Sequence, residues 1–325
     1  MVESAASVSG SGTPRPKSSS KSSSKSPPTS PPEISWPVNR PPEQGPWTPR
    51  LDAALRAHEA STLQHVSPNA LANEFYANGR RSLAGIALRA FLLGTTLGVS
   101  ILITLLLLYY NNNFWRATFF LAALSLFHFL EFWTTAAYNT PLATVASFLL
   151  TNGQRYQQAH TIAFLETLIT SYFFPDWQSH INPPFIIIIG LAMIVIGQSV
   201  RSVAMAQAGT NFNHQVQSRR NEGHELVTTG LYAWLRHPSY FGFFWWGLGT
   251  QVVLGNIVSF LGYLGVLWYF FSTRIRRKHI SLLSVPRCFM LTYSGVDEEK
   301  HLVDFFGDEY VAYRARTRVW IPFIR

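Results

Sequence analysis

The polar stretch from Gln217 to Tyr240, QSRRNEGHELVTTGLYAWLRHPSY, concentrates the side chains of this sequence that could do chemistry. It holds two histidines, three arginines, two tyrosines and Glu225, and long apolar segments lie before and after it. Pro238 pushes His237 toward extended geometry, so the bend should aim Arg236 and His237 away from the helix axis. The two histidines are thirteen residues apart, which matches no common zinc spacing, and we expect no metal site.

The composition places this stretch in a membrane protein. Charged residues make up only 13% of the chain and aromatic residues 14%, although about the first eighty residues are strongly polar. The remainder is far more apolar than an ordinary globular domain and predicts a polytopic membrane protein. The net charge of +9 is scattered through the tail, short loops and C-terminal segment, which favours a role in membrane topology over nucleic-acid binding. Cys288 is the only cysteine, which excludes an intramolecular disulfide.

The sequence predicts two regions. Residues 1–80 form a Ser/Pro/Lys-rich tail, expected to be disordered, and a juxtamembrane segment with patchy helical periodicity. Residues 81–325 form an all-α membrane-embedded domain. Asn256 alone separates the last two apolar spans, which therefore predict a tight antiparallel hairpin. About six transmembrane helices are expected, at 83–110, 115–138, 161–174, 185–205, 240–255 and 257–272, followed by an amphipathic C-terminal helical segment at 298–310.

Positive charges orient these spans. Arginines precede the first span, lie between the second and third and between the fourth and fifth, and follow the sixth as the Arg274–Lys278 cluster. The loops on the opposite side contain only Arg116 and Asp176 as charged residues. This bias predicts that both termini and the central loop face the cytoplasm.

Three ionisable residues fall inside predicted spans. His128 and Glu131 share one helix face, and Glu166 lies in the third span. They could form a proton path in a transporter, or they could be interhelical hydrogen-bond partners. The second interpretation is favoured because two helices supply all three residues and no further acidic residue continues a path.

Two interpretations also apply to Arg236 and His237. They could anchor the chain at the membrane interface beside Trp234 and Tyr240. Alternatively, the polar loop and the aromatic run from Phe241 to Trp246 could form a pocket with one polar and one apolar end, which suits an amphipathic substrate.

Longer motifs resemble one family. The run Gly209 to His214, then HELVTTGLYAWLRHPSYFG, then Gly249 to Gln251, and finally FFGDEYVAYRARTRVWIPFI at 305–324 are similar to the isoprenylcysteine carboxyl methyltransferases. The string RHPxYxG alone is weak, because phospholipid methyltransferases and sterol reductases carry similar strings. The ordered combination covers residues 83–325 and is specific.

The resemblance implies S-adenosylmethionine-dependent methylation of the C-terminal prenylcysteine carboxylate of CaaX proteins, whose termini carry a farnesyl or geranylgeranyl group. It places the enzyme as a multi-pass protein of the endoplasmic reticulum membrane, with its active site facing the cytosol. It implies that Arg274 binds the substrate and that Arg274 and Arg236 are catalytic. The cofactor contacts that it implies are Gln217, His224, Glu225, Leu226, Val227, Tyr232, His237, Pro238, Ser239, Tyr240 and Glu298. A phospholipid N-methyltransferase or a sterol-modifying membrane enzyme of related architecture is the alternative.

The sequence departs from the family pattern after Arg274. The family motif R-I-x-x-E-E places its glutamates four residues after the arginine, whereas about twenty extra residues separate Arg274 from Glu298 here. We interpret residues 276–296 as an atypical insertion or an unspliced segment. An intact site then requires Glu298 to return beside Arg274.

Overall fold

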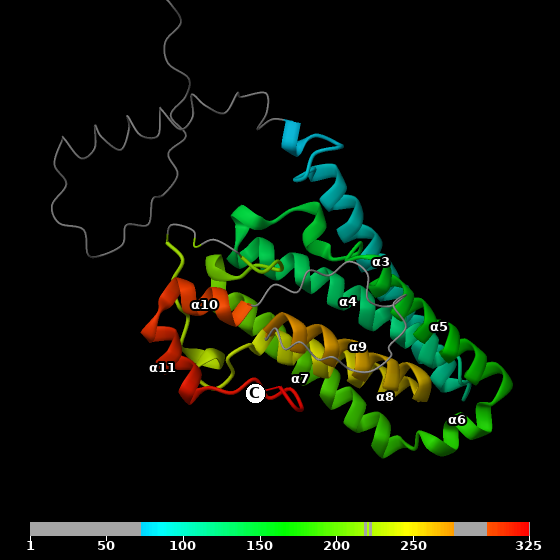
Figure 1. Cartoon of the computed structure of the whole chain (residues 1–325). Helices are drawn as coiled ribbons and strands as arrows, with labels where there is room; N and C mark the ends of the chain where they lie inside the picture. Colours follow the sequence, from blue (N-terminus) through cyan, green and yellow to red (C-terminus); the bar gives the residue numbers. More distant parts are fainter. Residues whose placement is uncertain (1–72, 218–219, 221–222, 276–297, 325) are drawn as a thin grey trace, which may run out of the picture. The chain divides into compact units, whose positions relative to one another are not determined.

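The structure, a computed structural model, describes residues 73–217, 220, 223–275 and 298–324. These residues are nearly all helical, as predicted (Figure 1). The predicted tail falls almost entirely outside the described residues, as does the atypical segment 276–296. The helices are α3 (Leu83–Tyr109), α4 (Trp115–Tyr138), α5 (Gln154–Phe173), α6 (Pro175–Ile181), α7 (Pro184–Ala208), α8 (Pro238–Leu254), α9 (Ile257–Ile275), α10 (Glu298–Phe306) and α11 (Asp308–Arg316).

Four of the described helices are long and apolar enough to cross a membrane: α3, α4, α7 with its short extension to Asn211, and α9. The chain is therefore a multi-pass membrane protein. The other two predicted spans are present as helices. However, α8 has 17 residues and α5 begins about two turns earlier than expected, with the polar residues of Gln154–Gln158. The count of six spans stays a prediction.

The predicted hairpin between the last two apolar segments is confirmed as a tight connection between α8 and α9. Gly255 ends α8 in the left-handed region, with φ of 70°, where a side chain would be strained. Asn256 then donates its amide hydrogens to the carbonyl oxygen of Ala163 and to the side chain of Gln251. The hairpin is thereby fixed to α5.

Glycines bring α7 and α8 into backbone contact. A β-carbon built on Gly197 would lie 2.6 Å from the backbone nitrogen of Trp246, and one on Gly242 would lie 2.5 Å from the carbonyl oxygen of Gly197. Two turns further along α8, a β-carbon on Gly249 would lie 2.9 Å from the carbonyl oxygen of Gly190. Helices in lipid associate by such close packing of small residues. The contact sets the relative height of these two antiparallel helices.

The C-terminal part follows the amphipathic prediction with one correction. The expected helix over 298–310 is divided, because Gly307 adopts a φ of 55° and separates α10 from α11. Beyond α11, Val319, Ile321 and Ile324 pack into the buried cluster formed by α4, α5, α8 and α9. The end of the chain is therefore part of the core of the membrane domain.

Candidate active site

A cavity of about 140 Å³ lies where the central loop, the start of α8 and the helices α10 and α11 meet. Arg236 lines it, whereas Arg274 does not line it but contacts Glu298 and Tyr240, which do. All eleven residues predicted to contact a cofactor line this cavity: Gln217, His224, Glu225, Leu226, Val227, Tyr232, His237, Pro238, Ser239, Tyr240 and Glu298. The central stretch at 217–240 and Glu298, about sixty residues later, are therefore brought to one place, although the role of these residues in binding stays a prediction.

The local sequence explains how the start of α8 presents its side chains. His237 has φ of −128° and ψ of 67°, as expected before a proline, and Pro238 begins the helix, where its missing N–H costs nothing. The rings of His237 and Tyr240 stack with centroids 5.3 Å apart. The backbone N–H of Arg236 donates to the carbonyl of Arg318 at 2.8 Å, which joins this turn to the chain after α11.

Glu298 returns beside Arg274, as an intact site requires. One carboxylate oxygen of Glu298 accepts a hydrogen bond from the Tyr240 hydroxyl at 2.5 Å and lies 3.8 Å from Nε of Arg274. The other carboxylate oxygen lies 3.7 Å from Nδ1 of His237. The extra residues between Arg274 and Glu298 therefore do not separate the two side chains.

Arg274 is buried and incompletely paired. Its Nη2 donates to the carbonyl oxygen of His214 at 2.5 Å, and its guanidinium lies over the rings of Tyr240 and Phe270 at 5.4 and 5.5 Å. Its Nε has no hydrogen-bond partner among the described residues. Arg274 is therefore a buried cation that packs against aromatic rings and has one N–H group without a hydrogen bond. Its planar guanidinium is suited to a planar anion such as a carboxylate.

Glu299, next to Glu298, was missed as a functional residue. It is only 3% exposed and does not line the cavity. Its carboxylate lies 2.6 Å from Nε of Arg236, 3.2 Å from Nε2 of His237 and 3.6 Å from Arg314. Burial raises the pKa of Glu299, but the hydrogen bond and charge of His237 and the charges of Arg236 and Arg314 outweigh it and hold the pKa below its usual value. Glu299 therefore anchors α10 in its ionised form.

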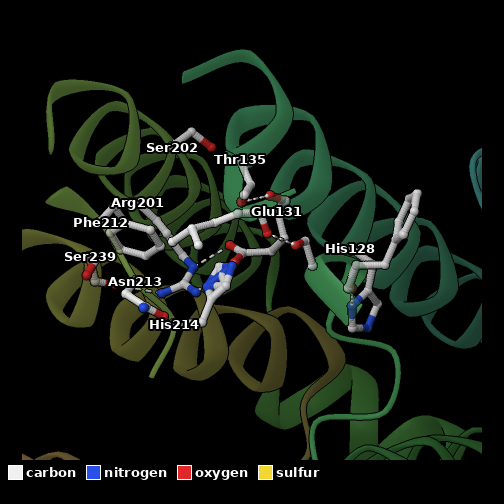
Figure 2. A network of polar contacts seen from close by, with 12 residues as sticks. His128, Glu131, Thr135, Arg201, Ser202, Phe212, Asn213, His214 and Ser239 are labelled. Atoms are coloured by element: carbon white, nitrogen blue, oxygen red, sulfur yellow. Dashed lines mark hydrogen bonds and ion pairs between the residues drawn. The ribbon is translucent and has the colours of Figure 1, made fainter. Parts of the chain in front are cut away.

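A buried ion pair supports the cavity from the membrane side. Arg201 in α7 contacts both carboxylate oxygens of Glu131 in α4, and its Nη1 donates to the carbonyl of Ser239 at 3.1 Å (Figure 2). His214 lies alongside, with Nε2 3.8 Å from Glu131 (Figure 2). Burial lowers the pKa of His214 to about 4, with the charges of Arg201 and Arg274 adding to this effect, so His214 is neutral at neutral pH. The ion pair is thus between Glu131 and Arg201.

The interhelical interpretation of the three ionisable residues within the spans is confirmed by their contacts. Beyond the pair of Glu131 with Arg201, the imidazole of His128 bonds to the carbonyl of Phe148 at 2.8 Å and to the hydroxyl of Tyr156 at 3.3 Å. Glu166 accepts hydrogen bonds from the backbone N–H groups of Val258 and Ser259 at the start of α9. Each residue therefore joins two elements of the bundle.

Among the buried polar atoms of the cavity-lining residues, Oε1 of Gln217 and Nδ1 of His224 have no hydrogen-bond partner among the described residues. Nε and Nη2 of Arg236 also make no hydrogen bond there, but the Arg236 guanidinium is ion-paired with Glu299. Buried polar groups are normally paired, and unpaired ones at a cavity indicate a polar ligand. No group of histidine, cysteine and acidic residues in the described part of the chain could hold a metal ion.

Several cavity residues were not predicted individually. Asn211 accepts a hydrogen bond from the backbone of Glu225 at 2.9 Å, and the Tyr313 hydroxyl donates to the carbonyl of Tyr232 at 2.8 Å. Asn211 lies in the motif run at 209–214, and Tyr313 in the C-terminal motif, so the motifs marked the right stretches. Spacing gave no reason to choose these positions within them.

Comparisons with known proteins agree with these motifs. The pattern of the isoprenylcysteine carboxyl methyltransferase (ICMT) family matches residues 188–284. The protein-S-isoprenylcysteine O-methyltransferase of Saccharomyces cerevisiae is 39% identical over 248 residues, which cover 75% of this chain and 93% of that protein. The Homo sapiens enzyme of the same name is 35% identical and is covered over 75% of its length. A solved structure of a eukaryotic intramembrane Ras methyltransferase, ICMT, has a TM-score of 0.65 at 30% identity and covers 86% of this chain and 88% of its own.

Proposed function

Because the chain belongs to the isoprenylcysteine carboxyl methyltransferase family, it is a membrane enzyme that methylates prenylcysteine carboxyl groups, and we propose that its cavity binds the methyl donor S-adenosylmethionine. The observation that carries this proposal is the convergence of the eleven expected cofactor residues on one cavity, with buried Arg274 in contact with two of them, Glu298 and Tyr240. The cavity needs both the central loop at 217–240 and α10, because each supplies part of its lining.

The chemistry of the cavity fits S-adenosylmethionine. Its unpaired polar atoms at Gln217 and His224 match a ligand with hydrogen-bonding groups, and the carboxylate of Glu298 matches a cationic amino group. At about 140 Å³, the cavity is smaller than the roughly 300–1,000 Å³ of pockets that enclose drug-sized ligands. Because the cavity is partly open, a cofactor of this size would extend beyond that volume.

Catalysis needs little acid–base chemistry. A terminal carboxylate has a pKa of about 3.5, so it is already ionised at neutral pH and needs no general base. The cofactor supplies an electrophilic methyl group. The protein must hold the carboxylate in line with that group and exclude water, and Arg274 is the residue proposed to hold it. The rings of Tyr240 and Phe270 pack against the guanidinium of Arg274 and restrict its movement.

Arg236 was expected to be catalytic beside Arg274. Its side chain lines the cavity, but its guanidinium is engaged by Glu299 and by the carbonyl oxygens of Arg314 and Thr317, at 3.1 and 3.4 Å. These contacts favour a positioning role. We propose that Arg236 holds α10 and α11 against the start of α8 and contributes positive potential to the site.

The partners proposed for the enzyme are prenylated CaaX proteins and membrane lipid. The membrane domain at 81–325 would lie in the endoplasmic reticulum with the cavity facing the cytosol. The arginine distribution supports this orientation, because the cavity lies on the side of the bundle where arginines flank the spans. Methyl transfer from labelled S-adenosylmethionine to N-acetyl-farnesylcysteine, with phosphatidylethanolamine as the competing acceptor, tests the substrate class. A methylated phospholipid and no prenylcysteine methyl ester would favour the alternative of a phospholipid N-methyltransferase.

Replacing Glu298 with glutamine is expected to weaken S-adenosylmethionine binding by roughly 10- to 100-fold, since a hydrogen bond to a charged group contributes about 1.5–3 kcal/mol. Equilibrium dialysis of the labelled cofactor measures this loss. Glu299→Gln is the matched control, because Glu299 does not line the cavity. It should lower the unfolding midpoint and weaken both ligands together. A similar profile for the two variants would contradict the proposed division of roles.

Deleting Arg276 to Gly295 is expected to preserve or raise activity. The deletion restores the family spacing, because the sequence then reads Arg274-Ile275-Val296-Asp297-Glu298-Glu299. It is compatible with the structure in that Arg274 and Glu298 already lie side by side. The methyl-transfer rate of the deleted and full-length proteins in the same membranes decides the matter. Loss of activity in a protein that still inserts would show that the segment belongs to the enzyme.

A further inference from the structure

The chain after α11 has two different faces. Between Thr317 and Ile324 the buried residues are Thr317, Val319, Ile321 and Ile324. The side chains of Arg318, Trp320 and Phe323 are exposed, and the exposed fraction reaches 61% for Trp320 and 93% for Phe323. A short segment therefore buries one face in the core and presents two large aromatic side chains on the other.

A hydrogen bond fixes the depth of this segment relative to α9. The indole Nε1 of Trp268 donates to the carbonyl oxygen of Pro322 at 2.9 Å. With 19 residues, α9 is about 28 Å long, close to the thickness of the hydrocarbon core. Trp268 lies seven residues before Ile275, about 10 Å from the end of the helix. Pro322 and Phe323 therefore lie within the span, not beyond it.

The backbone is strained to present these aromatic side chains outward. Trp320 has a φ of 56° and Phe323 a φ of 64°, a region that bulky residues rarely occupy. Such strain persists only where the surroundings compensate for it. Exposing aromatic side chains to water would add a further cost, whereas lipid around Trp320 and Phe323 would favour the observed conformation.

Neighbouring residues match a membrane interface. Leu235 and Arg318 form a bridge between two backbone segments, which brings Trp234, 78% exposed, next to the C-terminal segment. Arg316 and Arg318 are exposed at its start. Tryptophan at the boundary and arginine toward the headgroups form the usual arrangement at a bilayer surface.

We propose that residues 317–324 form an interfacial anchor that folds back from α11 along α9 and inserts Trp320 and Phe323 into the lipid leaflet at the C-terminal end of α9. Trp234 lies at the edge of this anchor. The occupant of the exposed face is bilayer lipid with anionic headgroups. The anchor fastens α11, and through it the wall of the cavity, to the membrane surface.

Site-specific quenching tests the anchor in the full-length protein. The variant Cys288→Ser removes the native thiol, and Phe323→Cys then accepts an environment-sensitive nitrobenzoxadiazole label. Ala312→Cys, exposed on α11, is the matched control. The proteins are reconstituted into phosphatidylcholine–phosphatidylserine vesicles. Methyl-transfer activity verifies folding, and Trp320→Cys provides a second labelled site.

The label at residue 323 is expected to be quenched several-fold more by lipids with a nitroxide on an upper acyl carbon than the label at residue 312. Aqueous iodide should give the opposite order. Iodide quenching at residue 323 as strong as at residue 312 would overturn the proposal, because the segment would then lie in water. Protection from both quenchers would also overturn it, because a protein, such as a second copy of this chain, would then cover the face.

Discussion

Replacing Arg274 with alanine is expected to lower kcat/KM for N-acetyl-farnesylcysteine by about 30- to 5,000-fold. Truncating one partner of a buried, hydrogen-bonded charge pair costs about 2–5 kcal/mol, and each 1.36 kcal/mol corresponds to a tenfold change. The loss falls on the acceptor because the proposed ligand of Arg274 is the substrate carboxylate. The variant would retain the cavity residues, so S-adenosylmethionine affinity should fall much less.

Steady-state methyl transfer with each ligand varied in turn measures the two effects separately. Arg89→Ala is a suitable control, because the guanidinium of Arg89 bonds to the carbonyl of Gly85 in its own helix. Arg274→Lys should recover only part of the activity, since an ammonium group cannot bind a carboxylate through two parallel donors. Equal losses for acceptor and cofactor in Arg274→Ala would contradict the assignment of this residue to the substrate.

Replacing Glu131 with leucine is expected to destabilise the protein by about 3–5 kcal/mol, because it leaves the charge of Arg201 buried and unpaired. The double variant Glu131→Leu/Arg201→Met should recover most of that stability, since both charges are removed together. Thermal unfolding of the detergent-solubilised protein, followed by circular dichroism, compares the three midpoints. Loss of the ion pair should also disturb the cavity, because Arg201 donates a hydrogen bond to the carbonyl of Ser239, which lines it.

Glu166→Gln is the matched control for this ion pair. Glu166 lies in a neighbouring helix and accepts from the backbone N–H groups of Val258 and Ser259, one through each carboxylate oxygen. Glutamine keeps one acceptor oxygen and leaves no charge buried and unpaired, so the replacement should lose one charge-assisted hydrogen bond and cost about 1.5–3 kcal/mol, less than Glu131→Leu. A transporter would behave differently. It would lose function in Glu131→Gln and keep it in Arg274→Ala.

Much of the fold followed from the sequence for simple reasons. Apolar runs bounded by asparagines and prolines defined most helices, because a helix that crosses a bilayer needs only sufficient length and an apolar composition. The start of α5 was placed too late, because the polar residues of its first turns, such as Gln154, carry no apolar periodicity. Gly307 was not recognised as a helix break, since a glycine between two amphipathic turns is compatible with either outcome.

The candidate site was predictable where motifs marked it and obscure where pairing depended on three-dimensional contacts. Spacing could not show which partners Glu298 and Glu299 contact. Both lie against His237, but Glu298 also contacts Tyr240 and Arg274, whereas Glu299 contacts Arg236 and Arg314. Nor could spacing reveal that Glu131 pairs with Arg201, seventy residues away. Burial of both ends of such a pair is visible only once the helices are packed.

The glycine contact between α7 and α8 has a mechanical consequence. Gly197 and Gly242 touch through backbone atoms, and backbone atoms have no alternative rotamers with which to yield. The start of α8 is therefore fixed relative to α7, whereas α10 is held to α8 only through side-chain contacts such as those of Glu299. Any widening of the cavity should therefore be one-sided, with α10 moving and the membrane helices staying in place.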